Sequence, residues 1–205
     1  MINFKNIYLA VNSQILFDNL NLSVLKGEKT AIKGRSGKGK TTLFNMLMGF
    51  VKPDKGEIYF DNLILNRNNI SKIRKRIAWL PQNPSIIGRG KIIEQLILPF
   101  HFKINKTLLP DHKSIEMELE KLNLDKSILK SSFEEISGGE KQRLGIIVCK
   151  LLKRDVLLLD EPTSALDKSN LNSVAEYLLK DKSLTVLSAS HDEEWLRHCD
   201  KIIDI

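Results

Sequence analysis

The feature that most constrains this chain is the glycine-rich stretch Gly34-Arg35-Ser36-Gly37-Lys38-Gly39-Lys40-Thr41-Thr42. It matches G-x-x-x-x-G-K-T, the pattern of a phosphate-binding loop. Thr30-Ala31-Ile32-Lys33 before it is typical of a strand end, and the apolar residues after it predict a helix that ends at Gly49. A strand, a glycine-rich loop and a helix in this order are the context that the motif requires.

The residue types of this loop suit an anionic ligand. Glycines at 34, 37 and 39 let backbone N–H groups approach phosphate oxygens, and the following helix N-terminus adds partial positive charge. The motif predicts that Lys40 reaches the β- and γ-phosphates of a nucleotide and that the Thr41 hydroxyl holds Mg²⁺. A glycine-rich turn without a ligand is the alternative, and the motifs farther along the chain argue against it.

The composition indicates in which cellular compartment we expect the chain. Hydrophobic residues make up 42% and charged residues 28% of its 205 positions, which is ordinary for a soluble globular protein. No apolar run approaches the ~18 residues that suggest a membrane span. The first residues, MINFKNIYLA, lack the continuous apolar core of a signal peptide. We therefore expect a cytoplasmic chain.

The net charge of +7 raises the question of an anionic partner, either nucleic acid or the inner face of a membrane. The densest basic cluster is Lys72, Arg74, Lys75 and Arg76. It has no interleaved aromatic residues that could stack on bases, so we expect no nucleic acid partner. A solvated face ahead of a buried strand is the simpler interpretation.

The order of patterns along the chain predicts an α/β fold. Short alternating stretches fill the N-terminal third, and Ile77-Ala78-Trp79-Leu80 is an apolar run closed by Pro81. From about 90 to 153 the apolar spacing is helical, and either Asp111 or Ser114 could cap one of these helices. A further helix is expected to start at Gly138-Gly139. We interpret this region as a helical subdomain inserted into a β-rich core.

Two carboxylates follow the most apolar strand. Val156-Leu157-Leu158-Leu159 reads as a parallel strand buried on both faces, and Asp160-Glu161 comes next. Ligands of open α/β sheets bind beyond the carboxyl ends of the strands. There Asp160 would hold Mg²⁺ and Glu161 would act as general base on the attacking water. The alternative is a solvated acidic turn. A last strand, Leu184-Thr185-Val186-Leu187, is predicted to lead to His191.

These motifs, in this order, resemble those of an ABC-type ATPase. They correspond to its Walker A, Q-loop, signature, Walker B, D-loop and H-loop, which here are 34–42, Gln82, Ser137-Gly138-Gly139-Glu140, 156–162, Ser164-Ala165-Leu166-Asp167 and His191. The resemblance implies a P-loop NTPase (RecA-like) core with an antiparallel β subdomain and an inserted α-helical subdomain. It implies one ATP-binding domain over 1–205, with the core at about 1–82 and 154–205 and the helical subdomain at about 83–153.

The resemblance also implies roles. ABC cassettes bind ATP and Mg²⁺ in a head-to-tail dimer, formed with a second copy or a related cassette, in which the signature of one chain contacts the γ-phosphate on the other chain's loop. Gln82 would sense Mg²⁺ and the attacking water, and His191 would contact the γ-phosphate. Most members place an aromatic residue ahead of the loop to stack on adenine. Here the corresponding place is near Val11, and the nearest aromatics are Tyr8 and Phe17.

Function follows from the resemblance as an expectation. The chain would be the ATPase subunit of a transporter, peripheral on the inner face of the cell membrane, with a separate integral membrane permease. The stretches Ile7-Tyr8-Leu9-Ala10, Leu96-Ile97-Leu98-Pro99-Phe100 and Ser127-Ile128-Leu129 are similar to those of small bacterial ATPases of iron-export systems. The apolar pairs Ile86-Ile87 and Ile97-Leu98, with Phe100, are expected to form an exposed groove for the permease.

Two alternatives remain open. One is a soluble ABC ATPase that acts on DNA or the ribosome, although such proteins usually carry a long coiled-coil insertion or two linked cassettes. The other is a P-loop kinase for a small molecule, which would need neither the Ser137-Gly138-Gly139 signature nor the Gln82 loop.

Overall fold

The strands that the structure describes form two sheets, one antiparallel and one parallel. The computed structural model describes residues 1–35, 37–84 and 90–205. Within these ranges, a four-stranded antiparallel sheet has the order β2-β1-β4-β5, and a five-stranded parallel sheet has the order β6-β7-β8-β3-β9. The strands are β1 (Ile2–Val11), β2 (Gln14–Val24), β3 (Lys29–Lys33), β4 (Lys55–Phe60), β5 (Leu63–Ile64), β6 (Ile77–Leu80), β7 (Val156–Asp160), β8 (Thr185–Ala189) and β9 (Lys201–Asp204).

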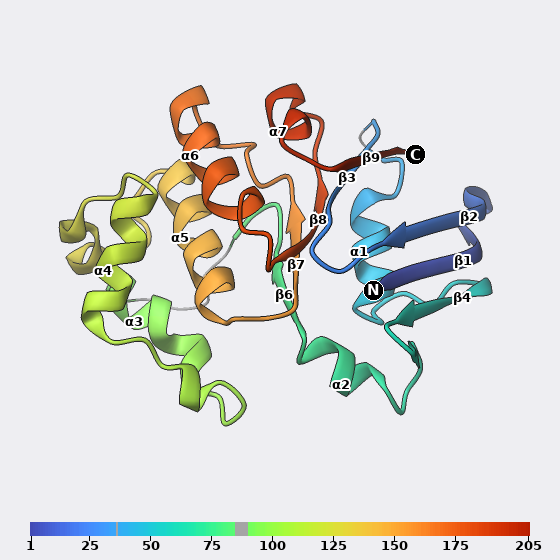
Figure 1. Cartoon of the computed structure of the whole chain (residues 1–205), viewed down its shortest axis with the longest axis horizontal. Helices are drawn as coiled ribbons and strands as arrows, with labels where there is room; N and C mark the ends of the chain where they lie inside the picture. The colour runs from blue at the N-terminus through green and yellow to red at the C-terminus, as the bar shows by residue number, and fades with distance from the viewer. Residues whose placement is uncertain (36, 85–89) are drawn as a thin grey trace.

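The helices lie mainly between β6 and β8. Most of them gather on one side of the parallel sheet, whereas the antiparallel strands and α1 lie on the other (Figure 1). The α-helices are α1 (Lys40–Leu47), α2 (Ile70–Arg74), α3 (Ile92–Ile97), α4 (His112–Lys121), α5 (Gly138–Leu151), α6 (Lys168–Leu179) and α7 (Glu193–Arg197), and the 3₁₀ turns are η1 (Leu98–His101), η2 (Lys106–Leu108) and η3 (Lys126–Lys130). No helix in these described ranges has the length and apolar character of a membrane span.

Strand β7 separates two hydrophobic cores. Val156 and Leu158 pack into the core that contains α1 and the antiparallel sheet. Leu157 and Leu159 pack into the other core, with residues of α3 to α7. Successive side chains of a strand point to opposite faces, so the uniformly apolar sequence of β7 is what a strand covered on both faces requires.

Most sequence expectations agree with these elements. Helix α1 follows the glycine-rich loop, and α5 begins at Gly138. The open choice of cap for α4 resolves to Asp111, whose carboxylate accepts a hydrogen bond from the Ser114 N–H at 2.7 Å. The fold class predicted from the sequence, a P-loop core with an antiparallel sheet and an inserted helical region, is confirmed.

The expectation that the strand at 184–187 is the last one was wrong. Strand β8 occupies that region, but β9 follows and pairs in parallel with β3, so that Thr30 lies opposite Lys201. The partners of β9 lie about 170 residues earlier in the chain, and four alternating residues are too few to reveal such a pairing. Beyond β9, the Ile205 carbonyl would lie 2.8 Å from a Cβ built on Gly34, so only glycine fits there.

The predicted exposure of Phe100 was also wrong. Its side chain is 1% exposed and packs in the helical core. Pro99 lies in the 3₁₀ turn η1, where three residues per turn replace the helical period and rotate Phe100 inward. Ile97 is half-buried, and Ile86-Ile87 lie outside the described residues. The exposed apolar side chains of this segment are instead Leu98, Phe102 and Ile104.

Candidate functional site

One cleft of about 520 Å³ brings most of the predicted site residues together. It lies where β3, β6, β7 and β8 end, at the carboxyl edge of the parallel sheet, which is where open α/β sheets bind ligands. The cleft is lined by Gly34, Arg35, Gly37, Gly39, Lys40, Thr41, Thr42, Gln82, Asp160, Glu161 and His191. Lys38 is exposed on the loop, and Ser36 lies outside the described residues.

The glycine-rich loop wraps around a lysine side chain. The Lys40 ammonium donates to the Gly34 carbonyl at 2.7 Å, which folds the loop back over the start of α1. Gly39 caps α1 with a φ of 98°, in the left-handed region that favours glycine. A Cβ at Gly39 would lie 2.5 Å from the Phe17 ring, so the β1–β2 hairpin also forbids a side chain there.

Two buried carboxylates face the loop from the end of β7. Asp160 and Glu161 are 3% and 7% exposed. The Thr41 hydroxyl donates to Asp160 Oδ2 at 2.7 Å, and Lys40 Nζ lies 3.7 Å from Glu161 Oε1. Burial raises the pKa of Asp160, and the Thr41 hydrogen bond opposes this shift. A hydroxyl beside a carboxylate is the hard oxygen set that Mg²⁺ prefers, so these residues fit that metal.

Two further polar side chains border the same cleft. His191, just after β8, places Nδ1 3.0 Å from Glu161 Oε2, while its ring remains 73% exposed. Gln82, two residues after β6, is exposed and lines the cleft from the other side. A carboxylate that contacts a lysine on one oxygen and a histidine on the other has a fixed orientation in the cleft.

The backbone of Glu161 is unusual. Its φ is 48°, a conformation that side-chain-bearing residues rarely adopt. Its N–H donates to the Ala189 carbonyl at 2.9 Å. Its own carbonyl accepts hydrogen bonds from the Ser164 N–H and from the side-chain amide of Gln142, both at 3.2 Å.

Sequence reasoning assigned no role to Gln142. The side chain is 1% exposed, although its two neighbours along α5 are the charged residues Lys141 and Arg143. A signal was present, because Gln142 shares a helical stripe with Ile146 and Cys149, both buried. A polar residue on a buried stripe needs a partner, and the spacing alone does not say that this partner is the main chain of Glu161.

The signature and D-loop residues lie together but away from this cleft. Ser137 caps α5, accepting from the Glu140 N–H at 3.2 Å, while the Glu140 carboxylate accepts from the Ser137 N–H at 2.7 Å. A Cβ on Gly139 would lie 2.8 Å from the Ala165 carbonyl, so the two segments are in contact. Among the described residues that line the cleft, none belongs to 137–140 or 164–167.

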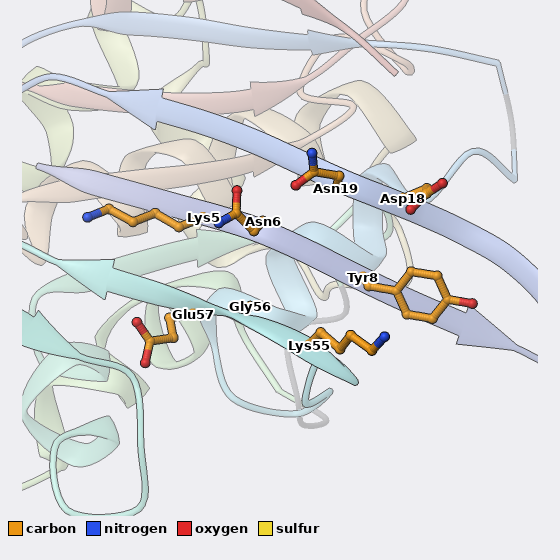
Figure 2. Close-up of a pocket in the computed structure, with 8 residues that line it drawn as sticks. All are labelled: Lys5, Asn6, Tyr8, Asp18, Asn19, Lys55, Gly56 and Glu57. Carbon is orange, nitrogen blue, oxygen red and sulfur yellow. The ribbon is translucent and has the colours of Figure 1, made fainter.

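The aromatic residues near the hairpin do not offer a face to the cleft. Phe17 is 5% exposed beneath Gly39. Tyr8 lies in a hollow of the antiparallel sheet, where the Lys55 ammonium is 5.5 Å from its ring centroid (Figure 2). The apolar side chains exposed near the end of the hairpin are aliphatic, with Val11 45% and Ile15 57% exposed.

The parallel sheet, the loop that wraps Lys40 and the carboxylates at the end of β7 define a P-loop NTPase. The family model described as ABC transporter matches residues 17–164. The chain therefore belongs to the ABC transporter ATP-binding family, and it is an ATPase that binds ATP.

Individual relatives agree with this assignment. The probable iron export ATP-binding protein FetA of Escherichia coli (strain K12) is 34% identical over 201 residues, covering 97% of this chain and 87% of the relative. The ergothioneine transport ATP-binding protein EgtV of Helicobacter pylori (strain G27) is 30% identical over 198 residues, covering 95% and 91%. The dimeric structure of MJ0796, a bacterial ABC transporter cassette, superposes with a TM-score of 0.85 at 28% identity, covering 100% of this chain and 94% of that one.

The contacts of Lys40 lead to a first prediction. Lys40→Ala should weaken ATP binding at least about tenfold, because hydrogen bonds to charged groups contribute about 1.5–3 kcal/mol. Lys38→Ala removes an exposed lysine of the same loop that does not line the cleft, and it serves as the matched control. Affinity is measured by titration with a fluorescent ATP analogue. Equal affinities for the two variants would show that Lys40 has no special part in binding.

Proposed function

We propose that the chain hydrolyses Mg·ATP with Glu161 as general base, and that it does so in a head-to-tail dimer which drives a separate membrane permease. The observation that carries the proposal is the convergence of Lys40, Glu161, His191 and the Thr41–Asp160 pair on one cleft. The loop residues 34–42 supply backbone N–H groups for the phosphates, and Lys40 contacts the β- and γ-phosphates.

Thr41 and Asp160 are the proposed protein ligands of Mg²⁺, with Gln82 completing the set from across the cleft. A bound Mg²⁺ would neutralise part of the phosphate charge. Because Mg²⁺ is usually held by one or two carboxylates together with substrate phosphates, a single carboxylate beside a hydroxyl is sufficient protein support.

Glu161 is the proposed base because its carboxylate is buried, oriented and adjacent to the loop. His191 contacts one of its oxygens, and we propose that it also contacts the γ-phosphate. Lys40, near the other oxygen, is pulled from Glu161 towards phosphate when nucleotide binds, which frees that oxygen to accept a proton from water. We expect the nucleobase to contact the aliphatic side chains of Val11 and Ile15, where most members of the family have an aromatic ring.

The second prediction tests whether Glu161 is the general base. Glu161→Gln keeps the size of the side chain but cannot accept a proton, so the hydrolysis rate should fall by about 10²-fold or more. ATP binding should persist, since the loop is intact. The rate is measured by phosphate release and the affinity by titration of the same sample. A rate close to wild type would assign the base to another group.

The dimer proposal rests on where the signature lies. Ser137 and Gly138 are exposed at the N-terminus of α5, outside the cleft of their own chain, so a second chain is needed to bring them to a γ-phosphate. The backbone N–H groups at a helix N-terminus are suited to bind that anion. We divide each chain into a nucleotide-binding core, at about 1–82 and 154–205, and a helical subdomain at about 83–153 that carries the signature.

The third prediction tests this arrangement by mixing two inactive variants. Lys40→Ala damages every loop of its homodimer, and Ser137→Arg damages every signature. In a mixed dimer both defects fall on the same site, and the other site is intact. By symmetry, equal mixing yields about half mixed dimers and restores about a quarter of the sites.

ATPase activity of the mixture should therefore exceed that of either variant measured alone, and the gain should rise with total protein concentration. Mixing each variant with itself at the same concentration is the control. Activity no higher than that of the separate variants, under conditions where light scattering shows dimers, would contradict a composite site that can act alone.

The membrane partner is expected to contact the helical subdomain. Leu98, Phe102 and Ile104 are 39%, 65% and 44% exposed within one short segment that follows α3. Exposed apolar side chains of this size mark interaction surfaces. The similarity to FetA, whose name describes iron export, makes metal or iron export our proposed substrate class. Binding to such a partner would hold the chain at the cytoplasmic face of the membrane.

The fourth prediction concerns this surface. Phe102→Glu and Ile104→Glu should abolish recovery of a membrane protein with the chain from detergent extracts, while basal ATPase activity stays unchanged. Leu25→Glu, at a residue 63% exposed in the turn between β2 and β3, is the matched control and should retain the partner. If the two variants lose ATP binding, the segment belongs to the folded core instead.

The alternative is a soluble ABC ATPase that acts on DNA or the ribosome. The basic cluster gives it little support, because Arg76 is paired with both Asp61 and Asp155. Arg74 donates to the Met48 carbonyl and covers the Phe50 ring. Two of the four cations of the cluster thus serve packing within the fold. ATPase activity stimulated by DNA or ribosomes would favour the alternative.

A further inference from the structure

A buried hydrogen bond connects the signature helix to the main chain of the proposed base. The Gln142 side chain donates from Nε2 to the Glu161 carbonyl at 3.2 Å, and the side chain is 1% exposed. Gln142 lies in the second turn of α5, and the signature residue Ser137 caps the N-terminus of this helix. A buried amide of this kind has a fixed position, because leaving a polar group unpaired in the interior costs free energy of folding.

The acceptor of this bond is the carbonyl of Glu161, a residue with an unfavourable backbone conformation. Glu161 has a φ of 48°, in the left-handed region, and its side chain projects towards Lys40 and His191 from that backbone. Strained backbone persists where surrounding contacts over-determine it. Ala189 provides one such contact from β8 and Ser164 another from the following turn, whereas Gln142 provides one from a helix.

We propose that Gln142 is a positioning residue, which aligns the carboxylate of Glu161 by holding its main-chain carbonyl from α5. The proposal rests on the proposed function of Glu161 as general base. Because Gly139 also packs against Ala165, α5 contacts both ends of the segment from Glu161 to the D-loop. A shift of the signature helix would therefore reach the base of the same chain through this hydrogen bond.

The test begins with Gln142→Leu, which removes the donor and keeps most of the volume. The kcat for ATP hydrolysis by the full chain should fall about tenfold, as expected for loss of one hydrogen bond that orients a catalytic group, with the ATP Kd unchanged. Leu144→Met alters a buried residue of the same helix by a volume-conserving change and should leave both unchanged. An unchanged kcat for folded Gln142→Leu overturns the proposal.

A second variant covers the case in which leucine is not tolerated. Gln142→Asn keeps the amide but shortens the side chain by one methylene, so the donor cannot reach the Glu161 carbonyl. It should show the same loss of kcat as the leucine variant. A wild-type kcat for Gln142→Asn overturns the proposal, because hydrolysis would then not depend on the hydrogen bond from residue 142 to the Glu161 carbonyl.

The deciding measurement is a double-mutant cycle with Glu161→Gln. If Gln142 acts through the carboxylate, Gln142→Leu should cause no further loss once that carboxylate is gone. Losses that multiply would show that Gln142 acts elsewhere and would overturn the inference. The Glu161→Gln single variant reports separately on the proposed function: if it hydrolyses ATP normally, Glu161 is not the base, whatever Gln142 does.

Discussion

The fold depends on compensating two carboxylates that are buried side by side. Asp160 and Glu161 lie at the end of a strand that is covered on both faces, and an unpaired charge in such a place costs several kcal/mol. Thr41 and Lys40, at the start of α1, provide this compensation. Thr41 and Asp160 are 119 residues apart in the chain. The parallel sheet brings these distant segments to one edge, so the cleft is a consequence of satisfying the charges.

The two cores on either side of β7 explain why this edge is rigid. Val156 and Leu158 are fixed by the antiparallel sheet and α1, and Leu157 and Leu159 by the helical layer. Close packing on both faces leaves a strand little freedom, because interiors are as dense as organic crystals. The carboxylates at its end are therefore held by contacts from both halves of the molecule, and the phosphate loop and the signature helix belong to opposite halves.

Local patterns were sufficient to predict much of this arrangement. The loop, its flanking strand and helix, and the position of Asp160 and Glu161 beyond a buried strand all follow from short stretches with strong chemistry. Strand β9 was missed because its pairing with β3 is non-local, and the face of Phe100 was misjudged because the turn at Pro99 breaks the helical period. The contact of Gln142 depends on how α5 packs, which a periodic pattern does not specify.

At position 161 the backbone conformation and the proposed chemistry favour different residue types. Glycine or asparagine would adopt a φ of 48° at lower cost than glutamate, so the fold alone would favour replacing it. Catalysis, as we propose it, requires the carboxylate. A screen of random variants for heat resistance alone should therefore enrich substitutions at this position that are stable and inactive, and among homologous sequences a glycine or asparagine here would mark a cassette that has kept its structure after losing hydrolysis.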